Sequence, residues 1–105
     1  MAAYVIVHRR KITNPERLKK YREDVHATIE KFGGKVLVRA DKFEVFEGEW
    51  HPGRKEDDDE PERLVLIEFP DMAALKSWYA SEDYAELKAI RHSSSLSDFV
   101  AVEGV

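Results

Sequence analysis

Short apolar runs alternate along the chain with segments in which apolar residues are spaced for a helix. Four runs rich in Val, Ile, Leu and Phe predict β-strands at residues 3–10, 35–40, 63–69 and 96–103. Between residues 14 and 33, apolar side chains recur every three or four positions, which is the spacing of one helix face. These side chains are Leu18, Tyr21, Val25, Ile29 and Phe32.

Capping residues set the limits of the predicted helices. Asn14 is a favourable N-cap for the first helix, and Gly33 suits the left-handed position that follows a helix. Asp71 and Ser81 are favourable caps for two further helical pieces, which we expect at residues 72–80 and 82–92. These two pieces together form the second helical element of the chain.

The region between the second and third strands is harder to assign. Residues 43–47 are predicted to continue the second strand or to pair with it as a hairpin. Residues 51–62 combine Pro, Gly and a run of carboxylates, which is typical of a solvated loop. We expect this acidic loop to be mobile and dispensable for folding, because its composition cannot repay the entropy of ordering.

The order of elements is strand–helix–strand–strand–helix–strand, which predicts a ferredoxin-like α+β fold with an antiparallel sheet and helices on one face. A sheet with its other face in water should alternate apolar and polar residues. Residues 4–7, 64–67 and 99–102 are instead apolar on both faces. Because no further helix remains to cover the second face, we expect a homodimer that forms through it.

Composition and charge narrow the possible functions. The 105 residues predict one domain, residues 1–105, and the lack of cysteine excludes disulfide and thiolate chemistry. The net charge of −4 is local, because residues 56–62 hold six carboxylates and the rest of the chain has 17 basic and 15 acidic residues. We therefore expect no nucleic-acid partner. The apolar runs are too short for a signal peptide or a membrane span, so we expect a cytoplasmic protein.

No sequence motif indicates a cofactor or a metal. The four histidines lack metal-ligand spacing, and the chain has no phosphate-binding glycine loop and no nucleophilic elbow. His8 shares a strand face with Tyr4 and Ile6, where a general base is possible but a structural histidine is the simpler interpretation. We therefore expect no cofactor and no metal site.

Tyr84 and Arg91 are the first candidates for a ligand site. They are seven residues apart, so they share one face of the predicted helix about 10 Å apart along its axis. In one interpretation Arg91 pairs with a carboxylate at the rim of the core. In the other, Arg91 holds an anionic ligand, which suits its bidentate guanidinium, and Tyr84 donates a hydrogen bond to it. We expect the first case, in which Arg91→Met should lower the free energy of unfolding by about 3 to 5 kcal/mol. Tyr84→Phe should leave the free energy of unfolding nearly unchanged.

Arg39, Glu68 and Trp78 complete the set of candidate site residues. Arg39 alternates in phase with Leu37, and Glu68 with leucines of the third strand, so either could point into a cavity beside those leucines. A charge on an apolar strand face requires a partner. Three ion pairs would supply such a partner: Arg39–Glu44, Arg39–Glu68 and Arg91–Glu68. Trp78 is expected in the core, with a pocket wall as the alternative.

Several ordered segments resemble the bacterial family called domain of unknown function 1330. They are "FGGKVLVRADKFEVFEGEW", "RLVLIEFP", "SWYASEDYAELKAIR" and the closing "VAVEG". The resemblance runs from about Tyr4 to Gly104, and Tyr84 and Arg91 fill two positions of the family pattern. It implies a dimeric α+β barrel, in which two ferredoxin-like units press their sheets together. That superfamily includes cofactor-independent monooxygenases, isomerases and haem-degrading proteins.

Two classes of function remain open. The first is a small-molecule site between helix 82–92 and the sheet, formed by Arg39, Glu68, Trp78, Tyr84 and Arg91. It would bind an anionic or aromatic molecule, either as a binding protein or as a cofactor-independent enzyme. The second is a dimeric interaction or structural module without catalysis. Unpaired polar groups around a cavity would favour the first class, and a filled core with paired charges would favour the second.

Overall fold

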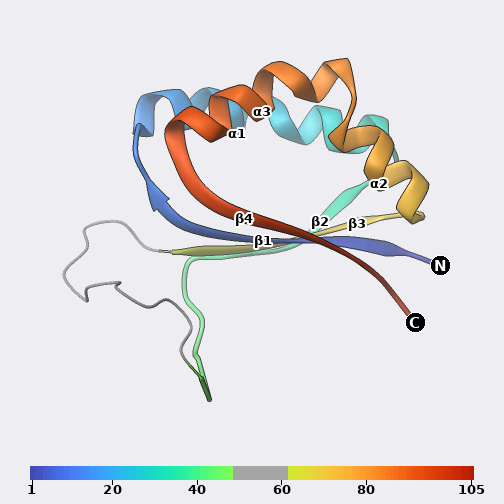
Figure 1. The fold of residues 1–105 in the computed structure, drawn as a ribbon, viewed down its shortest axis with the longest axis horizontal. Coiled ribbons are helices and arrows are strands. Elements are labelled where there is room, and N and C mark those ends of the chain that lie inside the picture. The colour runs from blue at the N-terminus through green and yellow to red at the C-terminus, as the bar shows by residue number, and fades with distance from the viewer. Residues whose placement is uncertain (49–61) are drawn as a thin grey trace.

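The computed structural model describes residues 1–48 and 62–105, and its elements follow the predicted order. The strands are β1 (Ala3–Ile12), β2 (Lys35–Ala40), β3 (Arg63–Phe69) and β4 (Ser95–Glu103). The helices are α1 (Pro15–Lys31), α2 (Met72–Tyr79) and α3 (Glu82–Ser94). The strands form one antiparallel sheet in the order β2-β3-β1-β4, and all three helices lie on the same side of it (Figure 1). The predicted ferredoxin-like α+β fold is confirmed.

The predicted caps begin and end the helices. The side chain of Asn14 accepts a hydrogen bond from the backbone N–H of Arg17 (3.2 Å), and that of Asp71 accepts one from Ala74 (2.7 Å). Ser81 does the same for Tyr84 (3.2 Å), so a break of two residues separates α2 from α3. These contacts satisfy backbone donors that have no partner within the helix.

The turn after α1 depends on two glycines. Gly33 has a φ of +81°, the left-handed conformation that favours glycine. Gly34 is buried, and a Cβ there would lie 2.7 Å from both Ile29 Cγ2 and Phe69 Cε1. The close approach lets α1 pack directly on the end of the sheet.

The predicted strand at residues 43–47 is wrong. The chain leaves the sheet after Ala40, residues 43–47 form no strand, and Phe46 is 90% exposed. Asp41 instead accepts two hydrogen bonds from Arg63 of β3, at 2.6 and 3.0 Å, which fix the chain at the end of β2. The cross-strand pair Arg39–Glu44 therefore does not form.

Most of the predicted acidic loop, residues 51–61, lies outside the described residues. Its last residue, Glu62, does not behave as a solvated loop residue. Its side chain is 1% exposed, and its Oε2 lies 3.0 Å from Nε2 of His8 on β1. The loop prediction therefore fails at this residue, because the carboxylate has a partner on the neighbouring strand.

The two faces of the sheet have different surroundings. The face toward the helices carries the core, including Ala3, Val5 and Val7 of β1. The face away from the helices is also apolar, as predicted, yet within the single chain its large side chains stay partly in water. These side chains, each 38% to 52% exposed, are Ile6, Leu37, Val38, Leu96, Val100 and Val102.

Candidate functional site

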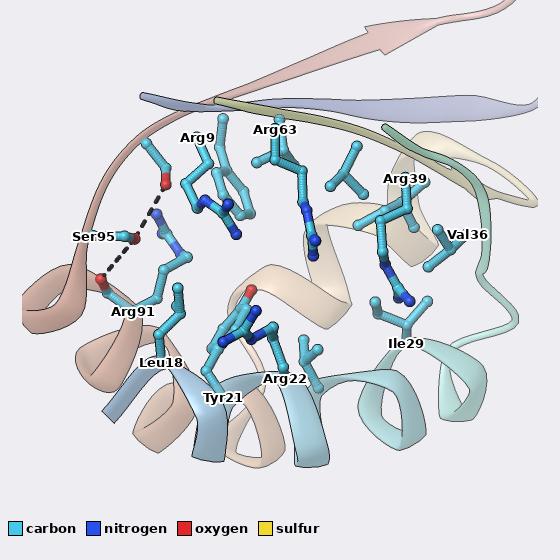
Figure 2. Close-up of a pocket in the computed structure, with 16 residues that line it drawn as sticks. Arg9, Leu18, Tyr21, Arg22, Ile29, Val36, Arg39, Arg63, Arg91 and Ser95 are labelled. Atoms are coloured by element: carbon cyan, nitrogen blue, oxygen red, sulfur yellow. Dashed lines mark hydrogen bonds between the residues drawn. The ribbon is translucent and has the colours of Figure 1, made fainter. Parts of the chain in front are cut away.

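A cavity of about 140 Å³ lies between α1 and the helix-facing side of the sheet, and α3 borders one end (Figure 2). Its apolar lining comes from α1 and from all four strands. These residues are Leu18, Val25 and Ile29 of α1 and Val7, Val36, Val65, Ile67 and Phe99 of the sheet. The predicted location, between sheet and helices, therefore contains a cavity, although α1 contributes more of its wall than helix 82–92.

Five arginines from five different elements line the cavity. They are Arg9 of β1, Arg22 of α1, Arg39 of β2, Arg63 of β3 and Arg91 of α3. Figure 2 shows those of the sheet pointing toward α1, with Arg91 rising from α3. The lining residues that the structure describes include no Asp or Glu. The charged side chains of this lining are therefore all positive, in a protein whose net charge is −4.

A β-bulge turns Arg39 toward this cavity. In the pairing of β2 with β3, Val36 is opposite Ile67 and Val38 is opposite Leu66, so Leu37 is an extra residue. The insertion reverses the alternation, and Arg39, opposite Val65, joins Val36 on the helix-facing side. The predicted phase of Arg39 with Leu37 is wrong for this reason, and Arg39 lines the helix-facing cavity rather than one beside Leu37.

Arg63 pairs with a carboxylate at the rim of the cavity. Its Nε and Nη2 both donate to Asp41 at the rim. The hydrogen bond from Arg63 is the main cause that holds the pKa of Asp41 below its usual value. Asp41 therefore stays ionised, whereas Arg22 and Arg39 form no ion pair with a described carboxylate.

Arg91 is 5% exposed and is surrounded by neutral groups. Its Nε donates to the hydroxyl oxygen of Tyr84 (3.3 Å), and its Nη2 lies 3.0 Å from Nε2 of His92. The guanidinium carbon is 3.9 Å from the ring centroid of Phe99, a cation–π contact. Neither predicted carboxylate pair of Arg91 is found within the described chain, so a buried cation borders the cavity without an acidic partner.

The environment of His92 keeps that imidazole available as an acceptor. Burial lowers the pKa of His92, and the neighbouring positive charges of Arg91 and Lys88 lower it further. A neutral imidazole accepts a hydrogen bond from Arg91 through Nε2, whereas a protonated one would repel it. The contact therefore adds no negative charge to the site.

Two tyrosine hydroxyls connect the cavity to the core. Tyr21 of α1 lines the cavity, and its hydroxyl oxygen is 2.8 Å from that of Tyr84, which is 0% exposed and does not itself line the cavity. Burial, followed by the nearby Tyr84, raises the pKa of Tyr21 well above its usual value. The sequence placed Tyr21 in the apolar stripe of the helix and missed it as a site residue.

Trp78 and Glu68 lie away from the cavity. Trp78 is 0% exposed, packs on the rings of Tyr84 and Phe69, and donates from Nε1 to Thr28 (3.0 Å). Trp78 is therefore a core residue, as first expected.

Glu68 is opposite Tyr4 in the sheet, on the face away from the helices, and its Oε1 is 3.5 Å from Lys35 Nζ. The predicted pairs of Glu68 with Arg39 and Arg91 are both wrong, because these arginines lie on the other side of the sheet. The structure brings together Arg39 and Arg91, with Tyr84 behind Arg91.

Other kinds of site have no counterpart in the described ranges 1–48 and 62–105. No group of three or more His, Cys, Asp or Glu side chains there is placed to hold a metal ion. None of the helices in these ranges has the length and hydropathy that a bilayer crossing requires.

The fold is shared with solved proteins of low sequence identity. A protein of unknown function from Rhodopseudomonas palustris is 16% identical, with a TM-score of 0.72 over 99% of this chain and 83% of that one. A dimeric ferredoxin-like protein of unknown function from Jannaschia sp. CCS1 is 13% identical, with a TM-score of 0.63 over 99% of this chain and 100% of that one. SnoaB, a cofactor-independent oxygenase from Streptomyces nogalater, is 10% identical, with a TM-score of 0.62 over 99% of this chain and 92% of that one.

The sequence comparisons identify a family and no activity. A search of curated protein sequences finds no match. The family model described as "Domain of unknown function (DUF1330)" matches residues 2–105, nearly the whole chain, in agreement with the resemblance seen in the sequence. The chain belongs to the DUF1330 family.

Proposed function

We propose that the arginine-lined cavity binds a small organic anion. The observation that carries the proposal is the convergence of five guanidinium groups on one cavity whose described lining contains no carboxylate. Arg22, Arg39 and Arg91 form no ion pair with a described carboxylate. Such cations are costly to crowd or bury, and an anion would compensate them. Guanidinium groups are well suited to carboxylates because they donate two parallel hydrogen bonds.

The apolar part of the lining narrows the class of ligand. Aliphatic residues of α1 and of the sheet form most of the wall, and Phe99 adds an aromatic ring. A ligand that fits both surfaces has a compact apolar or aromatic body and a carboxylate at one end. Fully inorganic anions would leave the aliphatic wall in contact with water.

Calorimetric titration with a matched pair of probes tests this proposal. Benzoate and benzamide have nearly the same shape, but only benzoate is an anion. We expect benzoate to bind and benzamide not to bind, with an affinity for benzoate that falls as salt is added. Equal binding of the two probes, or none, would contradict the proposal.

Arg39→Met and Lys35→Met separate the cavity from the general charge of the surface. Both replace a cation of β2 by a neutral side chain, but Arg39 lines the cavity whereas Lys35 pairs with Glu68 on the other side of the sheet. We expect Arg39→Met to weaken benzoate binding about tenfold or more, since a hydrogen bond to a charged group contributes about 1.5–3 kcal/mol. Lys35→Met should leave it unchanged.

We also propose that two copies of the chain associate through the sheet face away from the helices. The partly exposed apolar side chains of that face support this, as does the fold shared with a protein described as dimeric and ferredoxin-like. Val100→Lys, at a site 52% exposed in the single chain, should then yield monomers in light scattering. Ala85→Lys, on exposed surface of α3, is the control, and a wild-type monomer at micromolar concentration would refute the proposal.

A cofactor-independent enzyme is an extension of the anion-binding proposal. The fold likeness to SnoaB supports it, and any chemistry would then depend on the chain's own tyrosine and arginine side chains. Binding is therefore the first property to measure, because a substrate must first occupy the cavity.

A further inference from the structure

The buried hydroxyl of Tyr84 has two hydrogen-bond partners, and they differ in what they can do. One is Nε of Arg91 at 3.3 Å, and the other is the hydroxyl oxygen of Tyr21 at 2.8 Å. Tyr84 is 0% exposed, so water does not satisfy its hydroxyl. The direction of each hydrogen bond can therefore be worked out from the donors and acceptors present.

A guanidinium group has donors and no acceptor, so the Tyr84 oxygen must accept from Arg91. The Tyr84 proton then needs an acceptor, because an unsatisfied buried hydroxyl is costly. Within the described residues, the Tyr21 oxygen is the acceptor that the structure places in range. The order is therefore Arg91 to Tyr84 to Tyr21, each group donating to the next.

In this order, Tyr21 accepts from Tyr84, so its own hydroxyl proton is not donated to Tyr84. The Tyr21 side chain lines the cavity, and Figure 2 shows its hydroxyl directed from α1 toward that space. Burial and the neighbouring Tyr84 hold the pKa of Tyr21 well above its usual value, so the phenol keeps its proton at neutral pH. A hydroxyl donor therefore faces the cavity.

We infer that Tyr21 donates a hydrogen bond to the bound ligand, which therefore carries an acceptor oxygen, such as a ketone, in addition to its carboxylate. This inference rests on the proposed anion-binding function and narrows its ligand class to oxygenated carboxylates. With the carboxylate held by the arginines, a ligand without a second oxygen would leave the Tyr21 proton unsatisfied in the cavity, so the hydroxyl discriminates between otherwise similar acids.

The test compares acetylbenzoates with isopropylbenzoates of the same substitution pattern, in both the meta and para series. The two substituents are similar in shape, but only the acetyl group accepts a hydrogen bond. In at least one series, wild-type protein should bind the acetyl probe about two- to tenfold more tightly, the range of one net hydrogen bond. Tyr21→Phe should lose that preference while still binding benzoate. Tyr79→Phe removes a hydroxyl that does not line the cavity and should keep the preference.

Tyr84→Phe tests the direction of the hydrogen bond. Under our inference, Tyr21 already donates to the ligand, so Tyr84→Phe retains the preference for acetyl probes. If Tyr21 instead donated to Tyr84, wild-type protein would show no preference and the Tyr84→Phe variant would gain one. That result overturns the inference, as does a preference that survives Tyr21→Phe.

The same titrations keep the two proposals apart. Wild-type binding of benzoate without any preference for acetyl probes would overturn the role of Tyr21 alone. Failure of every carboxylate probe to bind would overturn the proposed function, and the inference with it.

Discussion

Replacing Arg91 by Met distinguishes a buried structural ion pair from a cation held ready for a ligand. Methionine keeps most of the apolar length of the side chain and removes the charge. The sequence alone led us to expect a loss of about 3 to 5 kcal/mol, the cost of leaving a buried carboxylate without its partner. The structure removes the basis for that expectation, because the partners of Arg91 are Tyr84, His92 and the ring of Phe99, which are all neutral.

The structure instead gives two opposed contributions of similar size. The variant loses a charge-assisted hydrogen bond to Tyr84, about 1.5–3 kcal/mol, and a cation–π contact of about 2 kcal/mol or less. It also no longer has to bury a guanidinium at 5% exposure, which costs several kcal/mol for an ion. We therefore expect the free energy of unfolding to change by less than about 1.5 kcal/mol.

Urea denaturation followed by circular dichroism measures this change directly. The midpoint should shift little and the slope should stay the same, which indicates an unchanged folded state. Benzoate should no longer bind the variant measurably. A loss of 3 kcal/mol or more with benzoate binding retained would refute the reasoning and restore Arg91 to a structural role.

Three further predictions concern residues around the cavity and the turn after α1. In an NMR titration, the pKa of His92 should lie below 6.5, and it should rise in Arg91→Met because that change removes one of the positive charges that lower it. In the wild type, the unfolded chain binds the His92 proton more readily than the folded chain does. Acidification below about pH 6.5 should therefore remove stability through His92. Tyr84→Phe should cost about 1–3 kcal/mol in a urea titration, not be silent, because it leaves the buried Arg91 Nε without its acceptor. Gly34→Ala should lower stability by about 1–3 kcal/mol, since the new methyl group would lie 2.7 Å from Phe69 Cε1 and packed cores resist added volume; an unchanged melting temperature would contradict it.

The sequence predicted the fold well because the deciding signals are local. The caps at Asn14, Asp71 and Ser81 act within one helical turn, so the helix starts were predictable. The segment 43–47 was predicted wrongly because a strand requires a partner as well as suitable residues. Nothing within those five residues reveals that Asp41, just before them, binds Arg63 of another strand.

The site was less predictable because it depends on the phase between distant elements. The bulge at Leu37 lies in an apolar run without Gly or Pro, so simple alternation put Arg39 on the wrong face. Three of the cavity arginines were missed altogether, although their phase was visible. Arg9 alternates with Val5 and Val7, Arg63 with Val65 and Ile67, and Arg22 follows Leu18 by four residues. A cation in phase with buried positions is the signal that would have found them.

If the cavity binds an anion as proposed, the crowding of like charges around it should favour binding at some expense to the stability of the fold. Arg9 and Arg63 are directly opposite each other on neighbouring strands, where like charges repel, and Asp41 binds Arg63 at the rim. Arg39 adds a third positive charge on the same side of the sheet and pairs with no described carboxylate.

Arg39→Met should therefore leave the free energy of unfolding unchanged or raise it by about 0.5 kcal/mol, the range of ordinary surface substitutions, while it weakens benzoate binding. Urea titrations with and without benzoate measure both quantities on the same samples, because a bound ligand stabilises the folded state in proportion to its affinity. A loss of more than about 1 kcal/mol without benzoate would mean that Arg39 stabilises the fold, and the positive charge of the cavity would then need a structural explanation.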